Sequence, residues 1–351
     1  MHEMEGIPQP SSVSKSTAEK VKARRKKAIK LEDLLQGVLD GNKSALSRAI
    51  TLIESTHPKH RKQASELLEK CLPHTNGALR IGITGVPGVG KSTFIESFGK
   101  IYTERKLNVA VLAVDPSSKL SKGSILGDKT RMEELVKDER AFIRPSASGT
   151  SLGGVARKTR EAIILCEAAG FDIIIIETVG VGQSETMVHS MTDFFLLLKL
   201  AGAGDELQGI KRGIMEMADA IVINKADGEN VKAAKLAKTE FNRALHLFPE
   251  KESGWTPKTL TCSAIANEGI DSIANLISEY VDLTQENGYF QQRRNEQNKF
   301  WLLQTIESAL KNDFYENPVI KKALKEQLAA LDDNKTTPFE AANHLLSLYQ
   351  K

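Results

Sequence analysis

The segment that most constrains the fold of this chain runs from Ile81 to Thr93 and reads I-G-I-T-G-V-P-G-V-G-K-S-T. Residues 79–84 are apolar and β-branched and predict a buried strand, and residues 93–102 predict a helix. A glycine loop between a strand and a helix turns its backbone N–H groups toward phosphate oxygens, and the helix N-terminus adds partial positive charge. The alternative, a surface turn with an exposed lysine, does not require this flanking pattern. The segment therefore predicts binding of a nucleoside triphosphate.

Each residue of the glycine loop is a candidate phosphate ligand, and two have further roles. Lys91 can reach the β- and γ-phosphates, and Ser92 can offer its hydroxyl to Mg²⁺. The candidate nucleotide-binding residues of the loop are Gly85, Val86, Pro87, Gly88, Val89, Gly90, Lys91, Ser92 and Thr93.

Apolar strands alternate with amphipathic helices from residue 78 onward, which predicts an α/β fold of the P-loop NTPase type. The expected strands are 79–84, 108–114, 141–144, 171–177, 193–199, 219–224 and 259–263. Such a pattern predicts a mostly parallel central sheet flanked by helices. Ligands of these sheets bind at the carboxyl ends of the strands, so motifs that follow strands are candidate site residues.

The chain divides into four expected parts. Residues 1–30 are rich in Ser, Lys and Arg and predict a basic, partly disordered arm, and 31–77 predict short helices. The GTPase domain is expected over 78–285. After residue 286 the strands stop and apolar helical stripes follow, with Asn317-Pro318 and Thr337-Pro338 as predicted helix starts. We expect 286–351 to be a helical dimerisation segment. The N-terminal and C-terminal helices are thus both expected to be extensions of the GTPase domain.

Carboxylates follow two of the expected strands. Asp115 directly follows the strand 108–114, and Glu177 is the last residue of the strand 171–177, with Gly180 just after it. A carboxylate at the end of an apolar strand can bind Mg²⁺ or a water molecule on it. A glycine shortly after it can offer its backbone N–H to the γ-phosphate. Asp128 lies in a polar loop that is a candidate switch near the metal. The alternative role for such strand-end acids is helix capping.

The strand 219–224 leads into Asn224-Lys225-Ala226-Asp227, an N-K-x-D sequence. The Asp227 carboxylate can accept hydrogen bonds from N1–H and the exocyclic NH₂ of guanine, whereas adenine presents a lone pair at N1. Asn224 can meet the Hoogsteen edge of the base, and the stem of Lys225 can cover its ring. Ser263 and Ala264 follow the next strand, where a backbone N–H can reach guanine O6. These motifs favour GTP over ATP.

Composition excludes several other classes of protein. A formal net charge of +3 is too small to indicate a nucleic-acid partner. The three cysteines Cys71, Cys166 and Cys262 are far apart, which suggests neither a zinc site nor a disulfide framework. No apolar run is long enough for a membrane span. We expect a cytoplasmic protein, or a mitochondrial matrix protein if the basic N-terminus is a transit peptide.

Seven longer motifs occur in order, and they resemble one family. They are GVPGVGKST, VDPSS, GSILGDKTRM, RPSASGTSLGGVARKTRE, ETVGVGQSE, GAGDELQGIKRGIMEMAD and NKADG. With them the chain resembles the MeaB/ArgK family of P-loop GTPases, whose members are relatives of the human methylmalonic aciduria type A protein. The resemblance extends from about residue 31 to the end and is densest over 78–270.

The resemblance implies a GTP-hydrolysing chaperone of an adenosylcobalamin-dependent acyl-CoA mutase, of the methylmalonyl-CoA mutase type. Such proteins gate cofactor loading, protect the mutase and form homodimers through C-terminal helices. By resemblance, Asp115, Asp128 and Glu177 are the Mg²⁺ and water-positioning carboxylates. Gln208 and Lys211 belong to a third switch that enters the site when the partner is bound.

Two departures and two alternatives accompany this resemblance. Lys122 stands before Gly123 where the family often has Gly-Gly, and Ala201 stands where a Pro is common; neither change removes a proposed ligand. One alternative is a transport-protein kinase or ATPase of the LAO/AO type, for which no separate protein-substrate site is evident. The other is a nickel-insertion metallochaperone GTPase, which would need a His-rich tract or Cys/His ligands.

Overall fold

The computed structural model of the chain describes residues 30–55, 57–114, 132–145, 152–178, 184–202 and 212–350. In this part of the chain, seven strands form one parallel sheet in the order β3-β2-β4-β1-β5-β6-β7. The strands are β1 (Leu79–Gly85), β2 (Val109–Val114), β3 (Ala141–Arg144), β4 (Ile173–Thr178), β5 (Phe194–Leu200), β6 (Ala220–Asn224) and β7 (Lys258–Thr261). The predicted α/β class is confirmed, and each predicted strand agrees with an observed one within two residues at either end.

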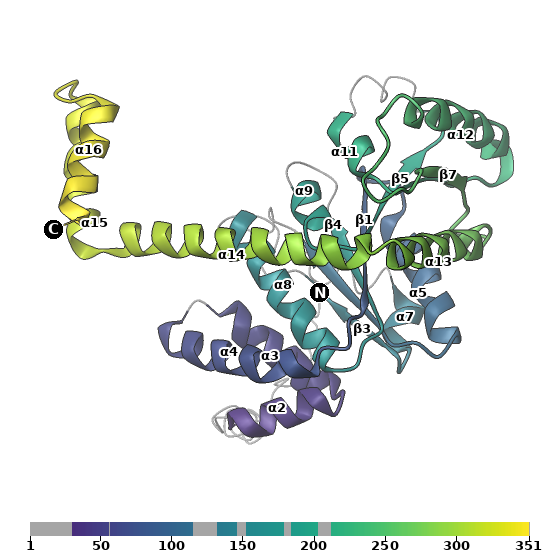
Figure 1. The fold of residues 1–351 in the computed structure, drawn as a ribbon, viewed down its shortest axis with the longest axis horizontal. Coiled ribbons are helices and arrows are strands. Elements are labelled where there is room, and N and C mark those ends of the chain that lie inside the picture. The colour runs from purple at the N-terminus through teal and green to yellow at the C-terminus, as the bar shows by residue number, and fades with distance from the viewer. Residues whose placement is uncertain are drawn as a thin grey trace, which may run out of the picture.

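Helices cover both faces of the sheet (Figure 1). One face carries α5 (Lys91–Glu104), α7 (Glu133–Lys137) and α13 (Ile270–Glu286). The other carries α8 (Leu152–Ala168), α9 (Ser184–His189), α11 (Arg212–Met217) and α12 (Val231–Leu245). The interior strand β4, next to the central β1, contains four consecutive isoleucines, all buried. A continuous apolar run of this kind is expected where a parallel sheet is covered on both faces.

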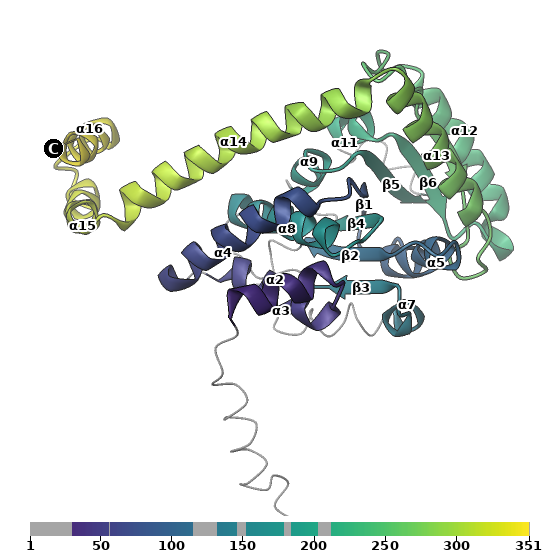
Figure 2. The same ribbon diagram turned by 60° about the horizontal axis from the view of Figure 1, so that its bottom comes forward.

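Three helices precede the sheet and pack on α8 (Figure 2): α2 (Leu31–Leu39), α3 (Lys43–Glu54) and α4 (Pro58–Cys71), followed by the 3₁₀ turn η1 (Leu72–His74). The Asn42 side chain caps α3, because its oxygen accepts hydrogen bonds from the backbone N–H groups of Ser44 and Ala45. The apolar face of α3, which includes Leu46 and Ile50, is fully buried in the same core as α8 and the sheet. The N-terminal helices are therefore part of the packed domain.

The longest helix, α14 (Tyr289–Glu316), leaves the sheet domain and carries α15 (Pro318–Asp332) and α16 (Pro338–Tyr349) at its far end (Figures 1 and 2). Its first half is anchored. The Arg294 guanidinium donates to both carboxylate oxygens of Asp193, at 2.8 and 2.6 Å, and the Trp301 indole N–H donates to the Ser190 carbonyl at 3.2 Å. Both acceptors lie between α9 and β5.

Among the described residues, no helix combines the length and apolarity needed to cross a bilayer.

Candidate functional site

The glycine loop joins β1 to α5 and requires glycine at two positions. Gly90 precedes α5 with a φ of 92°, in the left-handed region, and a Cβ there would lie 2.9 Å from Asn224 Nδ2. A Cβ on Gly85 would lie 2.7 Å from the carbonyl oxygen of Leu198 in β5. The loop is thus packed closely against the ends of β5 and β6, and side chains at these positions would displace it.

Lys91 is the first residue of α5 and is only 9% exposed. Its ammonium donates hydrogen bonds to the carbonyl oxygens of Gly85, at 2.7 Å, and Val86, at 3.3 Å. The cation is therefore held against the loop. Ser92 and Thr93 are half-buried on the first helical turn. Helix N-terminus, loop backbone and lysine together form an anion-binding arrangement.

The N-K-x-D segment contacts this loop directly, although 130 or more residues separate the two in the chain. Lys225 Nζ donates to the Gly88 carbonyl at 2.9 Å, and Asn224 Nδ2 donates to the Val89 carbonyl at 2.9 Å. Lys225 adopts a positive φ of 58°. The strand order explains the proximity, since β1, β5 and β6 are neighbours in the sheet. The predicted phosphate and base motifs thus lie side by side at the carboxyl edge.

The loop after β7 is tied to the same segment. The backbone N–H of Ala264 donates to Asn224 Oδ1 at 3.2 Å, and the Ser263 hydroxyl donates to the Asp227 carboxylate. Asn224 is only 2% exposed and bridges the glycine loop to the Ser263–Ala264 loop. The sequence predicted contacts with the base for these residues; the bridging role of Asn224 was not predicted.

The end of β4 places Glu177 between two neighbouring strands. Its register partners are Ile83 in β1 and Ala113 in β2, and its side chain is buried. Next to it, the hydroxyls of Thr84 and Thr178 lie 2.7 Å apart and link β1 to β4. This threonine pair is a feature that sequence reasoning missed, because no local pattern distinguishes two strand-end threonines 94 residues apart.

Five predicted site residues lie outside the described residues: Asp115, Asp128, Gly180, Gln208 and Lys211. Lys122, one of the two departures from the family pattern, lies outside them as well. Val114, the residue before Asp115, pairs with Thr178 at the end of β4. Within the described ranges, no group of three or more His, Cys, Asp or Glu side chains is arranged to hold a metal ion. The other predicted site residues are gathered around the ends of β1, β4, β6 and β7.

Comparison with known proteins identifies the family. The family model described as "Methylmalonyl Co-A mutase-associated GTPase MeaB" matches residues 46–319, which include the glycine loop, the N-K-x-D segment and the whole sheet. The chain belongs to the MeaB family. Since members of this P-loop family are GTPases, the chain is a GTP hydrolase with a guanine nucleotide as its bound ligand.

Individual MeaB relatives match over most of their length. "GTPase ArgK" of Escherichia coli is 44% identical over 320 residues, covering 91% of this chain and 97% of that protein. "Methylmalonic aciduria type A homolog, mitochondrial" of Mus musculus is 43% identical over 330 residues, covering 91% and 80%. A solved structure described as "Crystal structure of LAO/AO transport system kinase" superposes with a TM-score of 0.73 and 38% identity, covering 92% of this chain and 100% of that one.

Proposed function

We propose that this MeaB-family GTPase is a chaperone of an adenosylcobalamin-dependent acyl-CoA mutase of the methylmalonyl-CoA mutase type, gating cofactor loading and protecting the mutase. The observation that carries the proposal is the match to a mutase-associated GTPase family over residues 46–319. The mouse relative named for methylmalonic aciduria supports it, because methylmalonyl groups are the substrate of that mutase class. The proposed compartment is the cytoplasm, and the matrix remains the alternative. The free, buried cysteines of the described residues suit a reducing environment.

The described residues at the phosphate end fit Mg²⁺, because Ser92 supplies a hydroxyl and Glu177 a carboxylate, the oxygen donors that this ion prefers. We assign Ser92, Asp115, Asp128 and Glu177 to the metal and its waters, Asp115 and Asp128 on sequence alone. Bound Mg²⁺ would neutralise charge on the β- and γ-phosphate oxygens.

The chain's own residues then orient the reaction. The Lys91 ammonium would balance charge on the β- and γ-phosphates, and on sequence alone we assign the backbone N–H of Gly180 to a γ-phosphate oxygen. The Glu177 carboxylate accepts a hydrogen bond from the attacking water and so orients it. In-line attack needs little covalent chemistry from the protein, so positioning and charge supply most of the rate enhancement.

The alternative of a transport-protein kinase has one specific support, the name given to the structural relative. A kinase transfers the γ-phosphate to a protein, whereas a GTPase releases it as inorganic phosphate. The nickel-insertion alternative would need clustered His, Cys or carboxylate ligands, and within the described ranges no group of three or more of these side chains is placed to hold a metal ion.

GTP turnover with and without a mutase tests the proposed function. We expect slow phosphate release by the GTPase alone and a stimulation of at least about tenfold when a methylmalonyl-CoA mutase is added, because the partner completes the site. Phosphate release is followed at saturating GTP, with an unrelated acyl-CoA enzyme as the control. Absence of stimulation together with labelling of a binding protein by the γ-phosphate would favour the kinase.

We also propose that the GTPase is a homodimer held by residues after 286. The motivation is a stripe on α14 in which Leu303, Ile306 and Leu310 are 65%, 48% and 60% exposed. We expect Leu303→Lys with Leu310→Lys to give a monomer that still binds GTP, because burial of such a stripe drives association. Light scattering measures the mass, and Leu247→Lys, at a position 81% exposed beyond α12, is the control. A monomeric wild type at micromolar concentration would contradict the proposal.

A further inference from the structure

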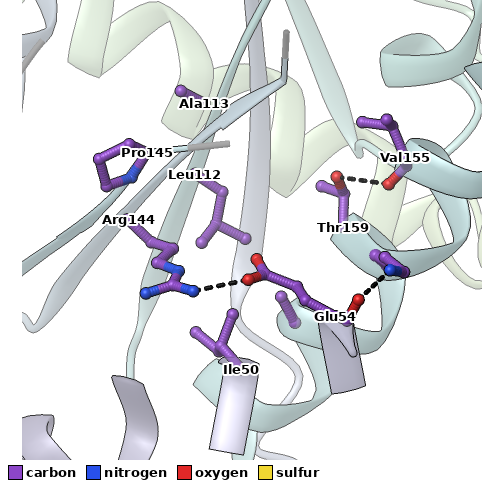
Figure 3. Close-up of a pocket in the computed structure, with 10 residues that line it drawn as sticks. Ile50, Glu54, Leu112, Ala113, Arg144, Pro145, Val155 and Thr159 are labelled. Carbon is purple, nitrogen blue, oxygen red and sulfur yellow. Dashed lines mark hydrogen bonds and ion pairs between the residues drawn. The ribbon is translucent and has the colours of Figure 1, made fainter. Parts of the chain in front are cut away.

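A small pocket lies at the carboxyl ends of β2 and β3, between α3 and α8 (Figure 3). Leu112 and Ala113 of β2 line it together with Arg144, the last residue of β3. Glu54, the last residue of α3, reaches into it from the N-terminal helices. The pocket brings together the Glu54 carboxylate and the ends of α3, β2 and β3, and the GTPase mechanism described above uses neither α3 nor β3.

Arg144 lies along one face of α3. Its guanidinium donates to the Glu54 carboxylate at 2.6 Å, to the Thr51 hydroxyl at 3.2 Å and to the Ser47 hydroxyl at 3.4 Å. The three acceptors are spaced as successive turns of one helix face. The side chains of Arg144 and Glu54 are 23% and 16% exposed, so this ion pair is more sheltered from solvent than an ordinary surface pair.

Glu54 makes a second contact through its backbone. The Lys158 ammonium of α8 donates to the Glu54 carbonyl oxygen, at the C-terminal end of α3, where a cation also complements the helix dipole (Figure 3). Burial lowers the pKa of Lys158, and the nearby Glu54 carboxylate opposes that shift. One residue thus connects β3 and α8, the two elements on either side of residues 146–151.

The position of this connection relates it to the GTPase site. Arg144 pairs with Leu112 of β2, and Leu112 pairs with Ile176 of β4, the residue before Glu177. β3 has four residues and is the edge strand of the described sheet, so it is paired on one side only. An edge strand this short has few ladder hydrogen bonds to hold its end in place. The Glu54–Arg144 contact supplies a fixed point at the level of Glu177.

We propose that Glu54 is a positioning residue of the GTPase reaction: by holding Arg144 and Lys158 together, it fixes the carboxylate side of the site for Mg²⁺. The inference rests on the proposed assignment of Mg²⁺ to the ends of β2 and β4. Glu54 acts through two strands and touches no nucleotide-binding residue among those described. The N-terminal helices therefore contribute to catalysis as well as to packing.

Binding of Mg²⁺ to the complex of the full chain with a non-hydrolysable GTP analogue tests the proposal by calorimetry. In Glu54→Gln, which keeps the shape and removes the charge, we expect the Mg²⁺ dissociation constant to rise about 3–10-fold. Loss of a residue that supports a metal ligand directly costs about 10–100-fold, and Glu54 acts from farther away. The affinity for the nucleotide in EDTA should be unchanged, and the Mg²⁺ concentration for half-maximal hydrolysis should rise by the same factor as the dissociation constant.

Two further variants separate positioning from general destabilisation. Glu279→Gln is the control, because it removes an ion pair with Lys258 that links α13 to β7 at the opposite edge of the sheet. Mg²⁺ binding should be unchanged in this variant. Arg144→Gln added to Glu54→Gln should add no further shift, because both act through one contact. An unchanged Mg²⁺ dissociation constant in a folded Glu54→Gln protein would overturn the proposal, as would an equal loss of nucleotide affinity in EDTA. A wild type without Mg²⁺-dependent hydrolysis would instead refute the proposed metal assignment.

Discussion

In Asp227→Asn, GTP affinity should fall by about 10²–10⁴-fold and xanthine nucleotide affinity should rise. The carboxylate is half-buried and oriented by the Ser263 hydroxyl, so its remaining acceptor capacity can face the base. Two hydrogen bonds between guanine and a charged acceptor are worth roughly 3–6 kcal/mol together, and their loss leaves donors on the base unpaired. The amide NH₂ of the variant can donate to the extra carbonyl of xanthine.

Fluorescent GDP and XDP titrations measure this exchange of specificity. Glu229→Gln, an exposed position two residues further along, is the matched control and should bind GTP as the wild type does. Equal affinity of the wild type for ATP and GTP would remove the basis of the prediction, because Asp227 would then not select the base.

Lys211→Ala should abolish most of the stimulation of GTP hydrolysis by the mutase while leaving GTP binding and intrinsic hydrolysis nearly unchanged. No arginine finger is evident in the sequence beside Ser92, and charge spreads over the γ-phosphate in the transition state. A cation supplied to the transition state raises the rate of hydrolysis roughly 10³–10⁵-fold. Lys211 follows three glycines in the motif G-A-G-D-E-L-Q-G-I-K and lies outside the described residues.

The rival assignment is that Lys211 solvates the start of its helix or pairs with Glu206 at the surface. Single-turnover and steady-state rates with and without the mutase decide between the two, with Glu206→Ala and Arg212→Ala as neighbouring controls. Under the rival assignment Lys211→Ala retains full stimulation, and that outcome would end the hypothesis.

Local patterns predicted much of this fold. The run Ile173–Ile176 and similar apolar stretches indicated the strands, because a doubly covered parallel sheet needs side chains that are buried on both faces. The glycine loop was predictable because its spacing encodes a backbone shape, with Gly90 at a φ of 92°. The Asn42 cap of α3 depends on an equally local contact, since its side-chain oxygen accepts from Ser44 and Ala45.

The side-chain contacts that the sequence did not predict join residues far apart in the chain. Thr84 contacts Thr178 only because β1 and β4 are neighbours in the sheet. The order of strands in a sheet cannot be inferred from local periodicity. Arg144 and Glu54 were single charges in a strand and a helix, 90 residues apart, and only the packing of α3 on the sheet edge joins them. The predicted roles of Asp115, Asp128, Gly180, Gln208 and Lys211 remain predictions, since these residues lie outside the described ranges.

The long helix α14 has a mechanical consequence. Arg294 and Trp301 of this helix donate hydrogen bonds to the turn between α9 and β5. The helix α9 begins six residues after Thr178, the last residue of β4. From Trp301 to Glu316 the helix runs about 22 Å at about 1.5 Å per residue. A tilt of about 10° at the anchors would carry its far end, with α15 and α16, through about 4 Å. The helix is a lever whose short arm is anchored at the amino ends of β1 and β5, the edge of the sheet opposite the nucleotide site, and whose long arm carries the surface proposed to join two copies.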